Sequence, residues 1–401
     1  MRKHFLLMFC MFVFSVTASF ANERTENNGN LILKNIPIIP ESIKNDLTQY
    51  QNVRSAPFRG FNNEGNEIFI TTRFGNVSQL HKVRKKGGAR EQITFFEEPI
   101  GSISRKPGGQ LIAFTMDAGG SENNQIFVLD PKNGSSQMLS DGQSRNGGPL
   151  WEKNGSRIAY QSTRRNGQSN DVWMMDSENI DSAEMILESP DGTWWGPSDW
   201  SKDGKKILIQ NYISITNAKA YLLDIESKKK EMILGSDSTE SYNAILSFDR
   251  SQKGVFFLTN EFGEFNQLAH KDLATNKISI LTKDIPWDIG GFAISTDYKR
   301  VAFTVNEGGM GSLYLMEAES KKYRKVKSIP IGLIGGIEFS EDGTKLGLTI
   351  NSYQTPSDSY VLNLKNNPLL YGSLNRWTVS EIGGLDVSEF VEPKLISYQS
   401  F

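Results

Sequence analysis

Apolar and polar residues alternate along most of the chain in a pattern that recurs seven times. Each copy begins with an apolar or aromatic segment, passes through a polar turn and continues with further apolar segments, as in PLWEKNGSRIAY, SDWSKDGKKILI and IEFSEDGTKLGL. A polarity period of two predicts β-strands. Pairs such as Asn154-Gly155 and Asp342-Gly343 predict tight hairpins, because their second residue readily adopts a positive φ. The pattern therefore predicts repeated antiparallel strands.

The copies recur every 44 to 50 residues. This spacing is measured between the turn residues, which we place at Gly65, Gly109, Gly155, Gly204, Gly254, Lys299 and Gly343. A period in the forties composed of strands is typical of a β-propeller, in which each repeat forms one blade. We expect an all-β fold in which residues 56–375 form about seven four-stranded blades. An eighth blade, completed by the flanking segments, stays an alternative. In the second copy we expect strands at 100–104, 111–116, 125–129 and 137–139.

Two further recurrences have structural explanations. An aromatic side chain precedes the first turn in most copies, and we expect it to pack between blades rather than bind a ligand. These aromatic residues are Phe58, Trp151, Trp200, Phe248 and Phe339. An aspartate ends the third strand in three copies, and we expect each one to cap its own turn. These residues are Asp130, Asp176 and Asp224. A metal site built from them is disfavoured, since each would lie on a different blade.

The first 21 residues have the three parts of a secretory signal peptide. A basic start is followed by an apolar run from Phe5 to Val16 and by small residues up to Ala21, after which we expect cleavage. The run is short for a membrane span and lacks a charged stop. We therefore expect a secreted or periplasmic protein that has no membrane span after cleavage.

The segments on either side of the repeats have different compositions. Residues 22–55 are expected to form a polar leader and an N-terminal strap that packs onto the first blade, with a short helix over 41–50. Residues 376–401 follow the last blade and are expected to act as a connector.

Charge and cysteine content exclude several classes of protein. The chain has 44 basic and 46 acidic residues, a formal net charge of −2, with both signs scattered along its length. This is not the electrostatic footprint of a nucleic-acid-binding protein. Cys10 is the only cysteine and lies inside the apolar run, so disulfides, thiolate catalysis and cysteine metal sites are not expected in the mature chain.

The sequence lacks a recognisable catalytic centre. No Gly-x-Ser-x-Gly string occurs, and the two histidines beyond the apolar run, His81 and His270, lie in predicted strands, where we expect them to face solvent. A Ser-His-Asp triad and a histidine metal site are therefore not expected, nor is a cofactor. A pair of carboxylates in the central channel stays open as the basis of an enzyme.

Binding is expected on the variable loops between the second and third strands, because loops on a rigid scaffold usually carry recognition. Arg73, Arg164 and Arg165 lie on two of these loops, and Trp194 and Trp195 precede the fourth blade. Guanidinium groups can hold a carboxylate in a bidentate manner, so these five residues are the candidate site for a peptide or protein segment. The structural alternative is that the arginines form salt bridges and the tryptophans pack between blades.

Segments before, within and after the repeats resemble one protein family. NIPIIPESIKNDLTQYQNVRSA, TTRFGNVSQLHKV and IAYQSTRRNG resemble the propeller of secreted bacterial serine peptidases of the prolyl oligopeptidase family, of the dipeptidyl peptidase IV and acylaminoacyl peptidase kind. The tail RWTVSEIGGLDVSEFVEPKLISYQSF resembles the connector to that family's α/β-hydrolase domain. The resemblance implies a propeller that caps the hydrolase active site and restricts entry to peptides or unfolded segments.

In that family the catalytic residues belong to the domain that follows the propeller. Since this sequence stops at Phe401, where the domain would begin, we expect no autonomous activity and a truncated or split peptidase whose hydrolase domain is encoded separately. A standalone TolB-like periplasmic propeller that binds a protein or peptide is the alternative. A propeller with its own carboxylate or metal site in the channel is a third reading.

Overall fold

Seven four-stranded antiparallel sheets follow one another along the chain, in a computed structural model that describes residues 23–399. The first blade has β3 (Phe58–Phe61), β4 (Ile68–Thr72), β5 (Gln79–Val83) and β6 (Glu91–Gln92). The second has β7 (Ile103–Arg105), β8 (Ile112–Met116), β9 (Gln125–Leu129) and β10 (Ser136–Met138). The third has β11 (Asn146–Trp151), β12 (Arg157–Ser162), β13 (Asp171–Asp176) and β14 (Asn179–Leu187). The fourth has β15 (Trp194–Trp200), β16 (Lys206–Ser214), β17 (Asn217–Asp224) and β18 (Lys230–Leu234).

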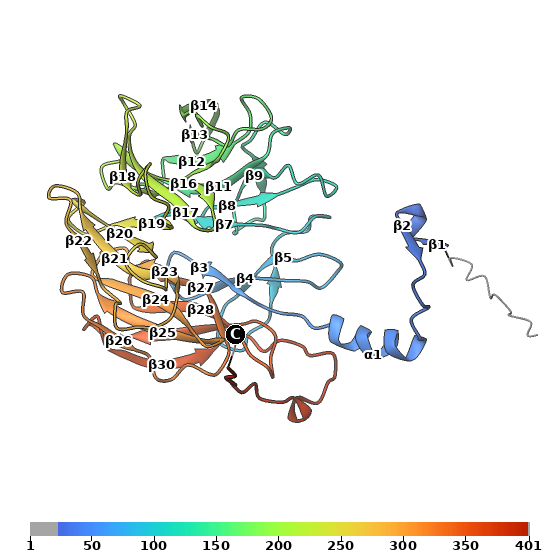
Figure 1. The fold of residues 1–401 in the computed structure, drawn as a ribbon. Helices are drawn as coiled ribbons and strands as arrows, with labels where there is room; N and C mark the ends of the chain where they lie inside the picture. Colours follow the sequence, from blue (N-terminus) through green and yellow to red (C-terminus); the bar gives the residue numbers. More distant parts are fainter. Residues whose placement is uncertain (1–22, 400–401) are drawn as a thin grey trace, which may run out of the picture. The chain divides into compact units, whose positions relative to one another are not determined.

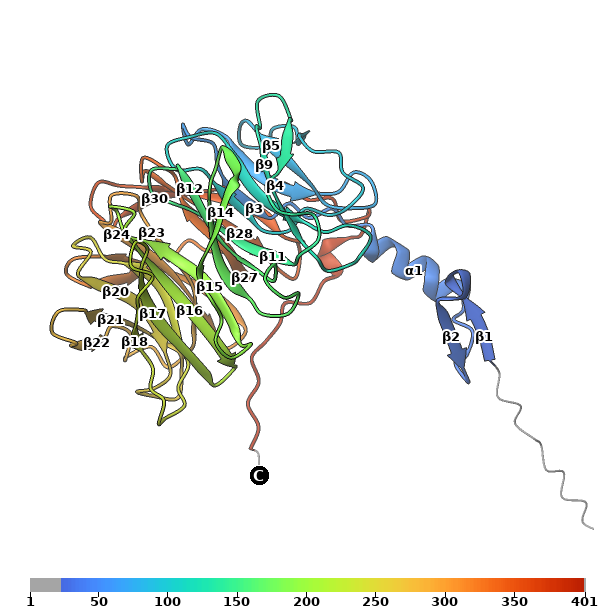
Figure 2. The same ribbon diagram turned by 90° about the horizontal axis from the view of Figure 1, so that it is seen from above.

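The fifth blade has β19 (Asn243–Phe248), β20 (Gly254–Thr259), β21 (Gln267–Asp272) and β22 (Ile278–Ile280). The sixth has β23 (Ile289–Ile294), β24 (Arg300–Glu307), β25 (Met310–Glu317) and β26 (Tyr323–Lys325), and the seventh has β27 (Leu333–Phe339), β28 (Lys345–Asn351), β29 (Asp358–Leu364) and β30 (Tyr371–Arg376). Figure 1 shows the blades around a common centre, with fourth strands such as β18, β22 and β30 at the periphery. Figure 2 shows the four strands of one blade, β15 to β18, side by side. The seven-bladed propeller is confirmed.

Of the described residues, 23–51 form a unit separate from the propeller. It contains the hairpin of β1 (Glu23–Glu26) and β2 (Leu31–Lys34), joined by a 3-10 turn over Asn27–Gly29, and the helix α1 (Glu41–Gln51). The expected short helix is confirmed, and none of its residues is buried. The packing of this strap onto the first blade stays a prediction. The predicted signal peptide lies outside the described residues.

Within the described residues, no helix has the length and apolar content that crossing a membrane would require.

Strand boundaries in the second blade lie close to the expected ones, except that its first strand starts at Ile103 rather than at residue 100. Two segments counted among the variable loops belong instead to strand pairs. Residues 306–311 continue the pairing of β24 with β25 without a break, and residues 211–219 continue that of β16 with β17 with a register shift between Tyr212 and Ser214. Aspartate capping is confirmed: the backbone amides of Lys132, Glu178 and Ser227 donate to Asp130, Asp176 and Asp224.

The turns between first and second strands need one residue with positive φ. Gly65, Gly155, Gly204 and Gly343 fill this place with φ between 66° and 75°, as expected. The assignment was wrong in three blades. The residue with positive φ is Gly108 rather than Gly109, Gln252 rather than Gly254, and Tyr298 rather than Lys299. The fifth and sixth blades therefore place a side chain where glycine would be less strained.

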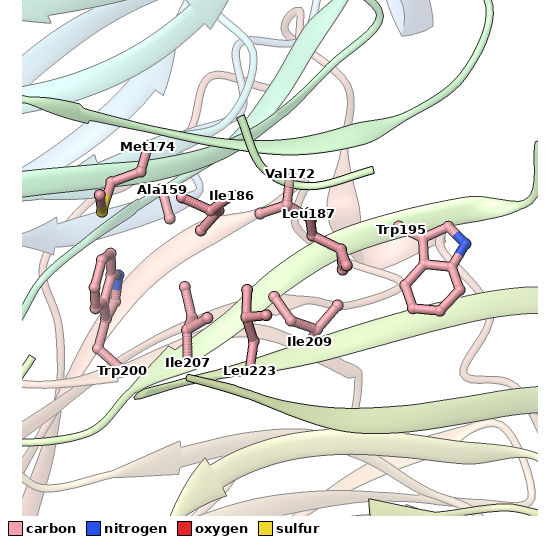
Figure 3. Close-up of a cluster of buried hydrophobic side chains, with 10 residues drawn as sticks. All are labelled: Ala159, Val172, Met174, Ile186, Leu187, Trp195, Trp200, Ile207, Ile209 and Leu223. Carbon is pink, nitrogen blue, oxygen red and sulfur yellow. The ribbon is translucent and has the colours of Figure 1, made fainter. Parts of the chain in front are cut away.

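Apolar side chains between neighbouring blades form the core, and the recurring aromatic residues belong to it as expected. Figure 3 shows the cluster between the third and fourth blades, in which Trp200 is completely buried. The indole Nε1 of Trp200 donates to the carbonyl of Leu150 in the preceding blade (3.2 Å), and Trp151 donates in the same way to Ser104 (3.0 Å). Each tryptophan thus joins its blade to the one before by packing and by a hydrogen bond.

Ring closure between the seventh and first blades involves no shared strand. The ring of Phe58 lies directly over Gly347, where a Cβ would be only 2.0 Å from Cζ of the phenylalanine. The amide of Phe58 donates to Thr349 Oγ1 (2.9 Å), and Ser359 Oγ donates to the carbonyl of Ala56 (2.7 Å). This closure seam is therefore built from buried side-chain packing and a few buried hydrogen bonds.

The propeller has two faces that carry different connections, because strand direction alternates within each blade. The loop face carries the connections from second to third strands and from each blade to the next. The hairpin face carries the turns between first and second strands and between third and fourth strands. Since β3 begins and β30 ends on the loop face, both ends of the propeller leave from it.

We predict that Gly347→Ala destabilises the propeller by about 1–3 kcal/mol, because the new methyl group forces the buried Phe58 ring to move. Equilibrium unfolding in guanidinium chloride measures the effect. Gly372→Ala in β30 is the matched control, since its Cβ would have no neighbour closer than 3.6 Å. Equal stability of the two variants would show that the seam tolerates a side chain at Gly347.

Candidate functional site

The loop face brings together the two ends of the propeller. Arg54, just before the first blade, forms an isolated β-bridge with Glu381, just after the seventh, and their side chains form an ion pair of 3.0 Å between Arg54 Nη1 and Glu381 Oε2. The guanidinium of Arg90 reaches the same place and donates to the carbonyl of Val379 (2.8 Å). The entry and exit segments are thus fixed against each other on this face.

Buried polar side chains hold the loop face in shape at the start of several third strands. Gln79 accepts hydrogen bonds from Thr94 Oγ1 (2.9 Å) and from the amide of Phe96 (3.0 Å). Asp358, completely buried, accepts from Thr378 Oγ1 and from Ser380 Oγ, both at 2.7 Å. These residues tie each third strand to the segment that leads into the next blade. These residues were not predicted. A Gln or Asp that recurs just after the variable loops could have indicated them.

Of the predicted site residues, Arg73 lies on the β4–β5 loop of the first blade and is half-buried. The neighbouring Phe74 is 48% exposed, and its ring meets the buried ring of His81 edge-on at 4.9 Å between centroids. The guanidinium of Arg54 lies 5.8 Å from the centre of the Phe74 ring. The first blade therefore presents an aromatic side chain next to the entry segment.

The adjacent arginines Arg164 and Arg165 on the β12–β13 loop have different roles. Arg165 grips the completely buried Asp171 with two hydrogen bonds (2.8 and 3.0 Å) and also lies 3.1 Å from Glu188. Arg164 is more exposed, lies 3.9 Å from Asp141, and stacks its guanidinium 5.2 Å from the ring of Trp173. The salt-bridge alternative applies to Arg165, whereas Arg164 faces solvent on the loop.

The two tryptophans also differ. Trp195 is 2% exposed and packs in the core between the third and fourth blades, 4.9 Å from Tyr221. Trp194 is 37% exposed and covers Gly196, where a Cβ would lie 2.5 Å from its ring. A short chain of hydrogen bonds links this segment to Arg165: Arg165 Nη2 donates to the carbonyl of Ser189 (3.5 Å), and Ser189 Oγ donates to that of Thr193 (3.3 Å).

The structure therefore joins the third-blade arginines to the segment before Trp194, whereas Arg73 lies two blades away. Ligand binding by these five residues stays a prediction.

A second feature of the loop face was not predicted. Large apolar side chains stand exposed on its loops and strand ends, and we call them the apolar rim. The rim consists of Phe74 (48% exposed), Ile215 (83%), Phe262 (49%), Met310 (39%) and Leu333 (54%). The five side chains come from five different blades, and exposed apolar side chains gathered on one face indicate a candidate interaction surface. The rim could have been predicted from isolated apolar residues within polar loops, such as Ile215 between Ser214 and Thr216.

Neither histidine of the described chain faces solvent, so that expectation was wrong. His81 is completely buried, its Nδ1 lies 3.0 Å from the carbonyl of Gln79, and burial lowers the pKa of its ring. His270 Nε2 lies 2.9 Å from Asp249 Oδ2. Burial alone would raise the pKa of Asp249, but hydrogen bonds from His270 and Ser251 hold it well below its usual value. Residues 23–399 contain no group of three side chains suited to hold a metal ion.

The comparisons with known proteins agree with this geometry. The family model described as "Prolyl oligopeptidase, N-terminal beta-propeller domain" matches residues 98–370, and the chain belongs to this family. A curated relative, an uncharacterized peptidase named YuxL from Bacillus subtilis, is 26% identical over 190 residues, which is 46% of this chain and 26% of the relative.

Solved structures share the fold. A prolyl endopeptidase superposes with a TM-score of 0.70 at 12% identity, over 87% of this chain and 53% of that one. Prolyl oligopeptidase B from Galerina marginata gives a TM-score of 0.67 at 11% identity, over 87% and 54% of the two chains. TolB from Acinetobacter baumannii gives 0.50 at 15% identity, over 68% and 67%. The chain thus spans about half the length of the solved prolyl peptidases.

We predict different effects for the adjacent arginine variants. Arg165→Ala leaves the buried Asp171 without its counter-ion and is expected to cost about 3 kcal/mol of stability or more. Arg164→Ala removes a long ion pair and a partly exposed contact with the Trp173 ring, and it is expected to cost about 1 kcal/mol or less. Urea unfolding of both variants tests this. Similar losses in the two variants would contradict a structural role confined to Arg165.

Proposed function

We propose that this chain is the propeller half of a serine peptidase, and that its loop face covers the active site of an α/β-hydrolase domain. In this role the propeller performs no bond cleavage itself. It restricts entry to short or unfolded peptides, and the arginines and Trp194 of the loop face contact the peptide as it enters. Membership of the prolyl oligopeptidase propeller family supports this assignment.

The observation that carries the proposal is the coincidence of two features on one face. Both ends of the propeller leave from the loop face, where Arg54 pairs with Glu381, so a following domain would attach there. The apolar rim lies on the same face, and side chains as exposed as Ile215 and Leu333 are expected to be covered by a partner. A catalytic domain on this face, whether joined to the connector or encoded separately, would bury the rim.

The same reading includes a location outside the cytoplasm. Residues 1–21 have the parts of a secretory signal, and Cys10 within them is the only cysteine of the chain. We propose that the mature protein is secreted or periplasmic and encounters peptides there.

A binding propeller without a peptidase partner is the second candidate. The similarity to TolB, over 68% of this chain, favours it, although at 15% identity the likeness extends only to the fold. In that case the apolar rim binds a protein or peptide other than a hydrolase domain.

Capture with an active-site probe separates these candidates. The full-length protein is immobilised, exposed to extract from the organism that encodes it, and the retained proteins are labelled with a fluorophosphonate that reacts with active serine hydrolases. We predict that the wild-type protein retains a labelled hydrolase and that Ile215→Asp loses most of it, because a charge in the rim prevents apolar contact. Ile180→Asp is the matched control, since Ile180 is 42% exposed but lies at a turn on the hairpin face.

A retained partner that the probe does not label, and that Ile215→Asp loses, would favour the binding propeller instead. Equal retention by the wild-type protein and Ile215→Asp would contradict both candidates. A parallel assay of the purified chain on chromogenic peptide substrates should give no turnover, because the reacting groups belong to the other domain.

A further inference from the structure

A cavity of about 430 Å³ opens at the centre of the hairpin face, and we call it the channel-mouth cavity. Its polar lining comes from five blades, because each of these residues ends or follows the first strand of its blade. These residues are Arg105, Lys153, Lys202, Tyr298 and Glu338. Since first strands run from the loop face to the hairpin face, the cavity lies at the end of the central channel remote from the apolar rim. Its volume is in the range of small-molecule sites, about 300–1,000 Å³.

Tyr298 is held in this cavity at a conformational cost. Its φ is 58°, in the turn position that glycine fills in five of the other blades. Its residue surface is only 5% exposed, and its hydroxyl forms no hydrogen bond of good geometry, although Lys153 and Gln252 lie near it. Burial raises the pKa of the hydroxyl, which keeps it protonated as a donor. Backbone strain combined with an unsatisfied buried donor is typical of functional positions.

Two ammonium groups share the Tyr298 ring. Lys202 Nζ lies 4.2 Å from the ring centre and Lys153 Nζ lies 5.7 Å from it. Lys153 is neutralised by Asp199, whose Oδ1 is 2.5 Å away. Within residues 23–399 no carboxylate pairs with Lys202, whose ammonium reaches only the carbonyl of Arg250 at 3.5 Å. The positive charge of Lys202, which lies over the Tyr298 ring and has no paired carboxylate within that range, therefore favours an anion.

The two glutamates that line the cavity both pair with Arg105. Glu338 Oε1 lies 3.3 Å from Arg105 Nε, and Glu341 Oε2 lies 3.6 Å from Arg105 Nη2. The remaining nitrogen, Arg105 Nη1, is buried and has no hydrogen-bond partner. The buried donors of this cavity without a hydrogen-bond partner are therefore Arg105 Nη1 and the Tyr298 hydroxyl. The two nearby glutamates would repel a doubly charged ligand such as phosphate more strongly than a singly charged carboxylate.

The cavity wall also includes serine and threonine residues and an aliphatic part, which contains Ile103, Pro107 and Ile294. A ligand that suits both parts has one negative charge and an apolar body. We propose that the channel-mouth cavity binds the free carboxylate of a short peptide, with Lys202 and Tyr298 holding the carboxylate and the aliphatic wall contacting the adjoining side chain. This site lies outside the loop face and does not depend on a catalytic partner.

Isothermal titration calorimetry on the full-length protein tests the assignment with N-acetyl-Ala-Leu, its C-terminal amide and inorganic phosphate. The acid should bind at least about tenfold more tightly than the amide, since a charge-assisted hydrogen bond is lost in the amide. Lys202→Met should weaken binding of the acid about tenfold, and Tyr298→Phe about fivefold. Added salt should weaken binding further, because the attraction is electrostatic.

Two control variants separate binding from structure. Lys277→Met removes an exposed lysine elsewhere on the hairpin face and should leave affinity unchanged. Tyr314→Phe removes a hydroxyl that donates to Glu307 Oε1 (2.8 Å), so it should lower the Tm without changing affinity. Tyr298→Phe should do the reverse: its affinity falls and its Tm stays the same or rises, because no good hydrogen bond is lost.

Equal affinity for acid and amide, or the absence of binding at millimolar concentrations, would overturn the proposal. Phosphate binding as tightly as the acid would overturn the assignment to a peptide carboxylate. A lower Tm with unchanged affinity in Tyr298→Phe would show that the hydroxyl is structural.

Discussion

Closure of the ring between the seventh and first blades is the constraint on which the rest of the structure depends. Every blade consists of four strands consecutive in sequence, so no strand crosses the seam. Closure depends instead on the Phe58 ring seated on Gly347, on Val361 in the same buried cluster, and on the hydrogen bond from Ser359 to Ala56. Once the ring is closed, the first strands surround a common channel. All second-to-third-strand loops then lie on one face and all hairpin turns on the other.

The two faces thereby acquire different chemistry. The loop face combines exposed apolar side chains such as Ile215 with the paired ends of the propeller at Arg54 and Glu381, an arrangement suited to a tethered partner. The hairpin face has at its centre a small, charged cavity in which Lys202 and Tyr298 present unused donors. The proposed protein partner on one face and the proposed small ligand on the other would therefore bind independently.

Much of the fold could be predicted from the sequence because it depends on local periodicity. The capping role of Asp130 follows from a pattern within a few residues, and the blade number and the packing role of Trp200 follow from the repeat of 44 to 50 residues. The cavity could not be predicted, because it joins residues from distant blades whose register is fixed only by the closed ring. Tyr298 shows the difficulty. The sixth copy has no glycine in its turn, so the turn residue was placed at Lys299, one residue after the tyrosine that has the positive φ. For the loop arginines, the sequence left ligand binding and salt bridging open, and it could not distinguish Arg165, paired with a buried aspartate, from its more exposed neighbour.

Native-state hydrogen exchange tests the central claim, that seven blades form one closed and cooperative ring. Amides of β3 and β4 at the seam should exchange with the same free energy, and the same dependence on denaturant, as amides of β19 and β20 in the fifth blade. That result would show that the side-chain seam is as strong as the interfaces between consecutive blades. Exchange of the first blade at a much lower free energy, while β19 and β20 stay protected, would contradict closure as the constraint that holds the structure together.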